Sequence, residues 1–391
     1  MSNKNKKTVM SCGGLESFLS STQAPSWKKN HNGKTCYEAY IEVKRNLEPI
    51  QKTVIEGAMA EGIRSTVENY KTELGTINKE ESEEIRIRKT HELFASDPVI
   101  FLNDHGPEHM EKVIDRANSI IFHFEKDPPS EFEAFLLLCA IQIHDIGNVL
   151  GRAGHERKLV DIFDNNCKST IPDTPERRAI KNIAMAHGGK SELGKDTISL
   201  LSPQETIFST QVRTRLLAAI LRFADELADD ATRANRAAMD LGILGTNSEI
   251  YHSYSRALHT VNVEGDSENH DCKVSLVYEL ETDELKKTYL VGGHEKYLLD
   301  EIYDRTLKME LERRYCMKFM YPCINIGRID VTINVYGRMS EKERTISYTL
   351  EDVSYPDAPV AGQIVSTWKK DVPSGEELLQ SLIERGVIDA E

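Results

Sequence analysis

Apolar residues recur at helical spacing along most of the first 250 residues of the chain. Between about residues 97 and 245 one amphipathic segment follows another, which predicts a bundle of helices. Ser130 with Glu133, and Ser202 with Glu205, fit the reciprocal capping box that opens a helix. Prolines fit the first helical position, where the missing N–H costs nothing, at three places: Pro107, Pro175 and Pro203.

The chain before this bundle divides into two parts. Residues 1–35 are rich in Ser, Lys, Asn and Gly without sustained periodicity, and we expect a flexible arm. From residue 36 to 96 the apolar residues again recur at helical spacing, within 37–74 and within 78–94, among many charged residues. These patterns predict an N-terminal helical segment that packs on the core or on a second subunit.

After residue 250 the period changes from helical to alternating. Strands are predicted at 260–263 and 273–280, and two more follow a helix at about 294–319. The later strands are 329–336 and 345–350, and Ser374 with Glu377 opens a last helix at 374–385. We therefore expect a smaller C-terminal α+β domain over residues 251–391, built as a β-β-α-β-β unit with a helical tail. The fold class as a whole is mainly α.

Net charge and cysteine spacing limit the classes of ligand and metal site that the chain is expected to have. The net charge is −14, which disfavours an extended nucleic acid as ligand. A small phosphorylated substrate stays compatible with it, because a bound divalent cation reverses the local field. The seven cysteines include no CxxC pair, so the pattern predicts neither a disulfide framework nor a thiolate zinc site.

Two stretches bear on membranes and location. The longest apolar run, 135–143, has about half of the ~20 residues that a membrane-spanning helix needs, and we interpret it as a buried core helix. Residues 1–7 are polar and lysine-rich with no apolar run behind them, unlike a secretory signal. We expect a cytoplasmic protein with no membrane partner.

The clearest chemical signal is the pair His144-Asp145. An apolar helix ends in these two ligand-type residues, and Gly147 follows them closely. Burying an ionised Asp beside an imidazole is costly without a partner, and a divalent cation is a partner that suits both. The simpler alternative is a hydrogen-bonded His-Asp pair at the end of a helix.

Three short motifs follow one another along the predicted bundle: His109-x-x-Lys112, then His144-Asp145, then Ala224-Asp225. This order resembles the HD superfamily of metal-dependent phosphohydrolases. The resemblance implies that residues 97–250 form the phosphohydrolase domain, and that His109, His144, Asp145 and Asp225 hold a metal ion. Residues 103–109, together with the α+β segment after the bundle, also resemble HD-type domains of bacterial stress and conflict systems.

His155 and His187 extend this set, with two roles left open. Some HD enzymes hold a second ion with two further histidines at corresponding places, in which case Asp145 would bridge two ions. Otherwise the two histidines orient a substrate phosphate or the attacking water around one ion. Imidazole and carboxylate ligands without cysteine suit a divalent transition metal, Mn, Fe, Co, Ni or Zn. Manganese is our first choice.

Basic residues near these ligands are candidates for binding substrate phosphate, and arginine suits bidentate phosphate contact. They are Arg152, Lys158, Lys190, Arg222 and Arg233. Each of them is also readily explained as a solvated charge on a helix surface. Asp145 and His105 are the candidate catalytic residues, although His105 precedes Pro107 and equally fits a hydrogen bond at the entry to the helix.

These observations lead to three hypotheses on function. The first is hydrolysis of phosphoester or phosphoanhydride bonds in nucleotides, with (deoxy)nucleoside triphosphates or related signalling nucleotides as the class that the resemblance implies. The second is a phosphodiesterase for cyclic mono- or oligonucleotides, which a two-metal site would favour. The third is a nucleotide-sensing regulator without turnover. The partners that we expect are a small phosphorylated substrate and further copies of the chain in a homo-oligomer.

Overall fold

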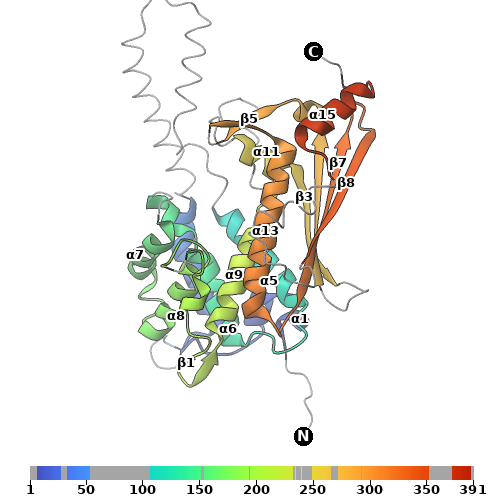
Figure 1. Cartoon of the computed structure of the whole chain (residues 1–391). Coiled ribbons are helices and arrows are strands. Elements are labelled where there is room, and N and C mark those ends of the chain that lie inside the picture. Colours follow the sequence, from blue (N-terminus) through green and yellow to red (C-terminus); the bar gives the residue numbers. More distant parts are fainter. Residues whose placement is uncertain are drawn as a thin grey trace, which may run out of the picture.

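The computed structural model describes residues 7–27, 33–52, 106–150, 154–192, 194–231, 249–265, 272–291, 293–351 and 372–388, together with the single residues 234 and 239. The helix expected at 78–94 and the second half of the one expected at 37–74 lie outside these residues, whereas residues 36–52 are helical. Figure 1 shows a helical bundle and a sheet, with the long helix α13 running from one to the other.

The N-terminal residues pack on the bundle. Helix α1 (Val9–Cys12) and helix α2 (Leu15–Ser20) are short, and their apolar side chains are buried in the main core. The backbone N–H of Leu15 donates to Asn118 Oδ1 at 2.9 Å. The flexible arm that we expected over 1–35 is therefore wrong for residues 7–27. A few well-spaced apolar side chains are sufficient to anchor the segment, although they are too few to form a periodic pattern.

The bundle includes residues 36–52 and the helices α5 (Pro107–Phe122), α6 (Glu131–Ile143), α7 (His155–Cys167), α8 (Thr174–Met185) and α9 (Thr214–Leu227). Helix α6 opens with the predicted capping box of Ser130 and Glu133. Prolines stand in the first turn of α5 and of α8, as predicted. Among the described residues one stretch, 131–150, is long and apolar enough to cross a membrane, and residues 133–148 of it are all buried inside the molecule. That burial fits a core helix.

The capping box expected at Ser202 and Glu205 is wrong. Strand β1 (Glu205–Ile207) and strand β2 (Thr210–Val212) form a small antiparallel hairpin there instead. Phe208 and Ser209 both have positive φ, 50° and 66°, as in the tight turns that match the twist of paired strands. Ile207 and Val212 are buried, so the hairpin places its apolar ends against the bundle before α9 begins.

The C-terminal part is a four-stranded sheet in the order β3-β4-β7-β8. Its strands are β3 (Leu258–Gly265), β4 (Cys272–Glu281), β7 (Ile326–Tyr336) and β8 (Lys342–Glu351). The central pair β4 and β7 is parallel, and the outer pairs are antiparallel. Helix α13 (Leu298–Met320) lies between β4 and β7 in the chain. This is the β-β-α-β-β order that the alternation predicted.

Smaller elements complete this part of the chain. They are α11 (Glu249–Ala257), α12 (Thr282–Leu285), the hairpin of β5 (Thr288–Val291) and β6 (His294–Tyr297), and α15 (Gly375–Glu384). The capping box of Ser374 and Glu377 opens α15, as predicted. The long helix begins at Leu298 rather than near 294, because residues 294–297 pair with β5 in the hairpin.

Helix α13 joins the two parts through charged side chains. Arg222, on α9, donates to both carboxylate oxygens of Glu312 at 2.7 and 3.0 Å, and only 7% and 12% of these side chains is exposed. One turn along, Lys308 pairs with Glu226 at 2.7 Å. Helix α9 also carries Asp225, so the packing of α13 bears on the candidate site described next.

Candidate metal centre

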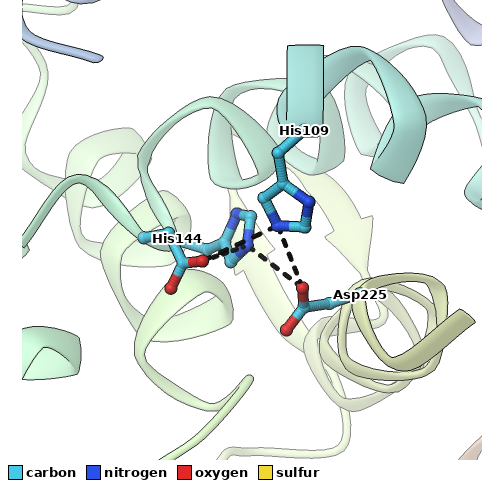
Figure 2. A group of neighbouring side chains, drawn as sticks. His109, His144 and Asp225 are labelled. Atoms are coloured by element: carbon cyan, nitrogen blue, oxygen red, sulfur yellow. Dashed lines mark ion pairs between the residues drawn. The ribbon is translucent and has the colours of Figure 1, made fainter. Parts of the chain in front are cut away.

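Three helices bring four candidate ligands together. His109 lies in the first turn of α5, His144 and Asp145 directly follow α6, and Asp225 lies near the end of α9. His109 Nε2 is 3.2 Å from Asp225 Oδ1, and His144 Nε2 is 3.6 Å from the same oxygen. Figure 2 shows the two imidazoles and the Asp225 carboxylate pointing toward one another. His109, His144 and Asp145 are buried, and Asp225 is partly exposed.

The spacing of the donor atoms fits a metal ion. One ligand atom from each of the four side chains lies within 4.8 Å of every other. Atoms bound at about 2.1 Å from one ion are themselves roughly 3–4 Å apart, and the closest pairs here are 3.2 and 3.5 Å apart. Two imidazoles with two carboxylates form a donor set that borderline transition metals accept.

Backbone hydrogen bonds fix which nitrogen of His144 faces the centre. The Nδ1 atom of His144 is 2.8 Å from the carbonyl oxygen of Ile141. Because a carbonyl only accepts, Nδ1 donates to it, and Nε2 is left facing Asp145 and Asp225 as the nitrogen that a metal ion would bind. Metal-binding histidines commonly donate their second N–H to a backbone carbonyl in this way.

A second group of donors shares Asp145. His155 Nε2 lies 3.2 Å and His187 Nε2 3.5 Å from Asp145 Oδ1. The other oxygen, Oδ2, lies 3.6 Å from His109 and 3.5 Å from His144. Each oxygen of one buried carboxylate therefore faces its own pair of imidazoles.

His187 is oriented in the same manner as His144. Its Nδ1 donates to the carbonyl of Ala184 at 2.6 Å, which leaves Nε2 toward Asp145. Both histidines follow the end of a helix, where the last carbonyls have no partner within the helix. The end of the helix thus selects the tautomer that suits a ligand.

Gly147 permits the close approach of His155. A Cβ at this glycine would lie 2.0 Å from the carbonyl oxygen of His155, which is closer than atoms can pack. Any other residue would push the start of α7 away and His155 with it. The glycine after the His-Asp pair is therefore required by the packing of the second group.

The carboxylates of Asp145 and Asp225 change the pKa values within the first group of donors. Burial by itself lowers the pKa of His144, but the carboxylates of Asp145 and Asp225 raise it to about 9. Burial raises the pKa of Asp225, and hydrogen bonds from His109 and His144 outweigh it and hold that pKa well below its usual value. The centre thus favours ionised carboxylates beside a cationic partner, which is also the environment that a metal cation occupies.

The family model HD-CE matches residues 99–308, more than half of the chain. The chain belongs to the HD-CE family. The HD-CE match spans both groups of donors and ends inside α13, so it takes in the start of the segment that we assigned to the C-terminal α+β domain. No curated protein and no solved structure matches the chain. The HD-type domain and the buried His/Asp cluster together indicate a metal-dependent phosphohydrolase.

The structure describes three of the basic residues expected to bind phosphate, and their surroundings differ. In this HD-CE protein Lys158 Nζ donates to the carbonyl of Leu150 at 2.6 Å, and Lys190 is exposed just beyond His187. Arg222 is buried, and the guanidinium that we expected to bind phosphate donates instead to Glu312 on α13 and to residues 195 and 197. A buried arginine and a surface arginine look alike in sequence, since the partner lies 90 residues away.

Three candidate residues lie outside the described residues: His105, Arg152 and Arg233. Sequence reasoning also overlooked Glu156, whose Oε2 lies 3.5 Å from His155 Nδ1. An acidic residue in the first turn of a helix is usually explained by the helix dipole, so its position next to His155 was the only available signal.

Proposed function

We propose that this protein hydrolyses phosphoester or phosphoanhydride bonds of nucleotides, with (deoxy)nucleoside triphosphates or related signalling nucleotides as substrates. The observation that carries the proposal is the buried Asp145 carboxylate between two pairs of imidazoles. The HD-type domain supports hydrolysis at phosphorus. The restriction to nucleotides rests on the resemblance of the ordered ligand set to the HD superfamily.

The chain's own residues would bind and orient the reacting groups. His109, His144, Asp145 and Asp225 would hold the first divalent ion, and His155 and His187 would join Asp145 at a second. Manganese stays our first choice. Such ions make water acidic enough to act as a nucleophile near neutral pH, and they withdraw charge from phosphoryl oxygens.

The shared carboxylate also favours a second candidate, a phosphodiesterase for cyclic mono- or oligonucleotides. Two ions held on the two sides of one carboxylate can stabilise the attacking and the leaving oxygen together. The two candidate functions use the same metal-binding side chains and differ only in substrate. The products of the reaction therefore distinguish them.

A substrate screen tests both. Purified protein loaded with Mn²⁺ would be incubated with pools of nucleoside triphosphates and of cyclic nucleotides, and products would be identified by mass spectrometry. We expect turnover of one pool by the wild type and by Asp161→Ala, which changes an exposed aspartate on α7, and loss of turnover in Asp145→Ala. Full turnover in Asp145→Ala with normal metal content would overturn the site assignment.

A further inference from the structure

A hollow of about 230 Å³ lies beside the second histidine pair. Its walls come from the start of α7, the end of α8 and residues within 188–191 and 197–201, the second of which includes the short helix η2 (Ile198–Leu200). Glu156 lines the hollow and lies 3.5 Å from His155, and Gly188 lines it directly after His187. The hollow therefore adjoins the second histidine pair through Glu156 and Gly188.

The walls combine an apolar surface with cationic side chains. Met185, Leu200 and Leu201 supply apolar surface, and 61% of Leu200 is exposed although it is a large hydrophobic residue. Arg157 and Lys190 are exposed cationic residues of the same lining. An apolar surface beside two cations suits a ligand with a flat apolar ring and an anionic group.

The size of the hollow limits what it takes. Pockets that enclose a whole drug-sized ligand are usually about 300–1,000 Å³. A hollow of about 230 Å³ has room for one ring system and not for a complete nucleoside triphosphate. The remainder of such a ligand would have to lie outside it, past Arg157 and Lys190 in the lining and toward the second histidine pair.

We propose that this hollow binds the nucleobase of the substrate, with Arg157 and Lys190 contacting the phosphate chain between the hollow and the histidine pairs. The proposal rests on the proposed function and adds to it the part of the protein that would distinguish a nucleotide from inorganic polyphosphate. Selection of the base by Met185 and Leu200 would be mainly by shape and apolar contact.

Hydrogen bonds from neighbouring helices hold the outer wall in place. The hydroxyl of Tyr315, on α13, donates to Asp196 at 2.7 Å and accepts from the backbone N–H of Ile198 at 2.9 Å. Arg222 donates to Thr197 Oγ1 at 3.0 Å, and that hydroxyl donates to the carbonyl of Ala186 at 2.7 Å. A wall fixed in this way binds without the entropic cost of ordering a loop.

Binding of nucleosides tests the hollow separately from the metal centre. Full-length protein treated with a chelator would be titrated with adenosine, guanosine, cytidine and thymidine, and binding followed by saturation-transfer NMR. These probes have no phosphate and so do not depend on a metal ion. We expect at least one nucleoside to bind, and Leu200→Asp to weaken that binding by roughly tenfold. Leu290→Asp, at another exposed leucine on β5, is the matched control.

A separate variant tests the proposed contact between Lys190 and the phosphate chain. Lys190→Ala should weaken binding of the matching nucleoside monophosphate several-fold and leave the nucleoside unaffected, whereas Lys168→Ala, at an exposed lysine after α7, should change neither. Unchanged nucleoside binding in a folded Leu200→Asp protein, or no nucleoside binding by the wild type, would overturn the proposal.

Hydrolysis of inorganic triphosphate by the Mn²⁺-loaded protein separates the two proposals. If the wild type binds a nucleoside through Leu200 but hydrolyses neither nucleotides nor triphosphate, the hollow stands and the proposed function falls. If triphosphate and nucleotides are hydrolysed equally well and Leu200→Asp affects neither, the proposed chemistry stands and the nucleobase site is overturned.

Discussion

At the scale of single residues, Asp145 and Glu133 show two ways to bury a carboxylate. Asp145 faces four imidazoles, through two oxygens that each serve one pair. Glu133 instead accepts two hydrogen bonds from the guanidinium of Arg213, at 2.7 and 2.8 Å. An arginine guanidinium stays protonated and does not become a metal ligand, whereas an imidazole can lose its proton and bind a metal ion. The first arrangement suits a metal site and the second a structural one.

Changing His187 to Ala separates one-metal from two-metal chemistry. If His155 and His187 hold a second ion with Asp145, the His187→Ala protein should bind about one ion per chain where the wild type binds about two, because the first group keeps its ligands. Metal content after loading and gel filtration measures this. A wild type that binds one ion, and a variant that keeps it while losing rate, would show that these histidines act on substrate or water.

Glu133 gives a prediction about pH. Burial raises the pKa of Glu133, but the ion pair with Arg213 outweighs it and holds the pKa below its usual value. A carboxyl group whose pKa is lowered in the folded state contributes its full stabilisation at pH values above its pKa in the unfolded chain. This stabilisation is lost as the pH falls through the pKa of the folded state. Glu133→Gln should therefore lower the free energy of unfolding by about 3 kcal/mol at neutral pH, and by less below about pH 4.

Urea unfolding at several pH values measures this difference. Glu125→Gln, at an exposed glutamate before α6, should change the free energy of unfolding by less than about 0.5 kcal/mol. A difference between wild type and Glu133→Gln that stays constant down to pH 3 would contradict the assignment of the lowered pKa to this ion pair.

At the scale of elements, the contact of α9 with α13 connects the bundle to the sheet. The ion pair of Arg222 with Glu312 lies within it, and Arg222 also lies 4.6 Å from the centre of the Tyr315 ring. Removing one partner of a buried pair leaves an uncompensated charge, whereas replacing both with apolar residues is often tolerated.

Glu312→Ala should lower the free energy of unfolding by about 3 kcal/mol, and the double variant Arg222→Met with Glu312→Leu should recover most of that loss. The comparison is made by urea unfolding, with Glu295→Ala at an exposed glutamate of β6 as the control. A double variant as unstable as the single one would show that the hydrogen bonds of Arg222 to residues 195–197 matter more than its pairing with Glu312.

At the scale of the whole molecule, the first donor group ties three helices together. His109, His144 and Asp225 come from α5, from the end of α6 and from α9. A ligand that binds only the folded state stabilises that state, and the stabilisation grows with the ratio of ligand concentration to Kd. It is about 2.7 kcal/mol when the concentration is a hundred times Kd. Saturating Mn²⁺ should therefore raise Tm by several degrees and EDTA should reverse this.

Differential scanning fluorimetry checks this prediction. Asp145→Ala should show little or no rise in Tm with Mn²⁺, and Asp161→Ala should respond like the wild type. An equal rise in all three proteins would mean that the ion stabilises the chain at some other place.

The sequence by itself determined the features that depend on short stretches of chain. The helical period, the capping box at Ser130 and the change to alternation after residue 250 each involve residues a few positions apart, and local backbone preference decides them. Adjacent ligand types at His144 and Asp145 are likewise visible in one stretch. The grouping of His109 and Asp225 with them entered through the resemblance and not through any local rule.

Only the tertiary structure decided the features whose partners are far apart in the chain. Arg222 pairs with Glu312, 90 residues away, and Val9 and Phe18 are buried in the core of the later bundle. The hollow beside His155 likewise has walls from three separate segments. Burial and pairing depend on what packs opposite a side chain, and a one-dimensional pattern contains no information on which distant segment that is.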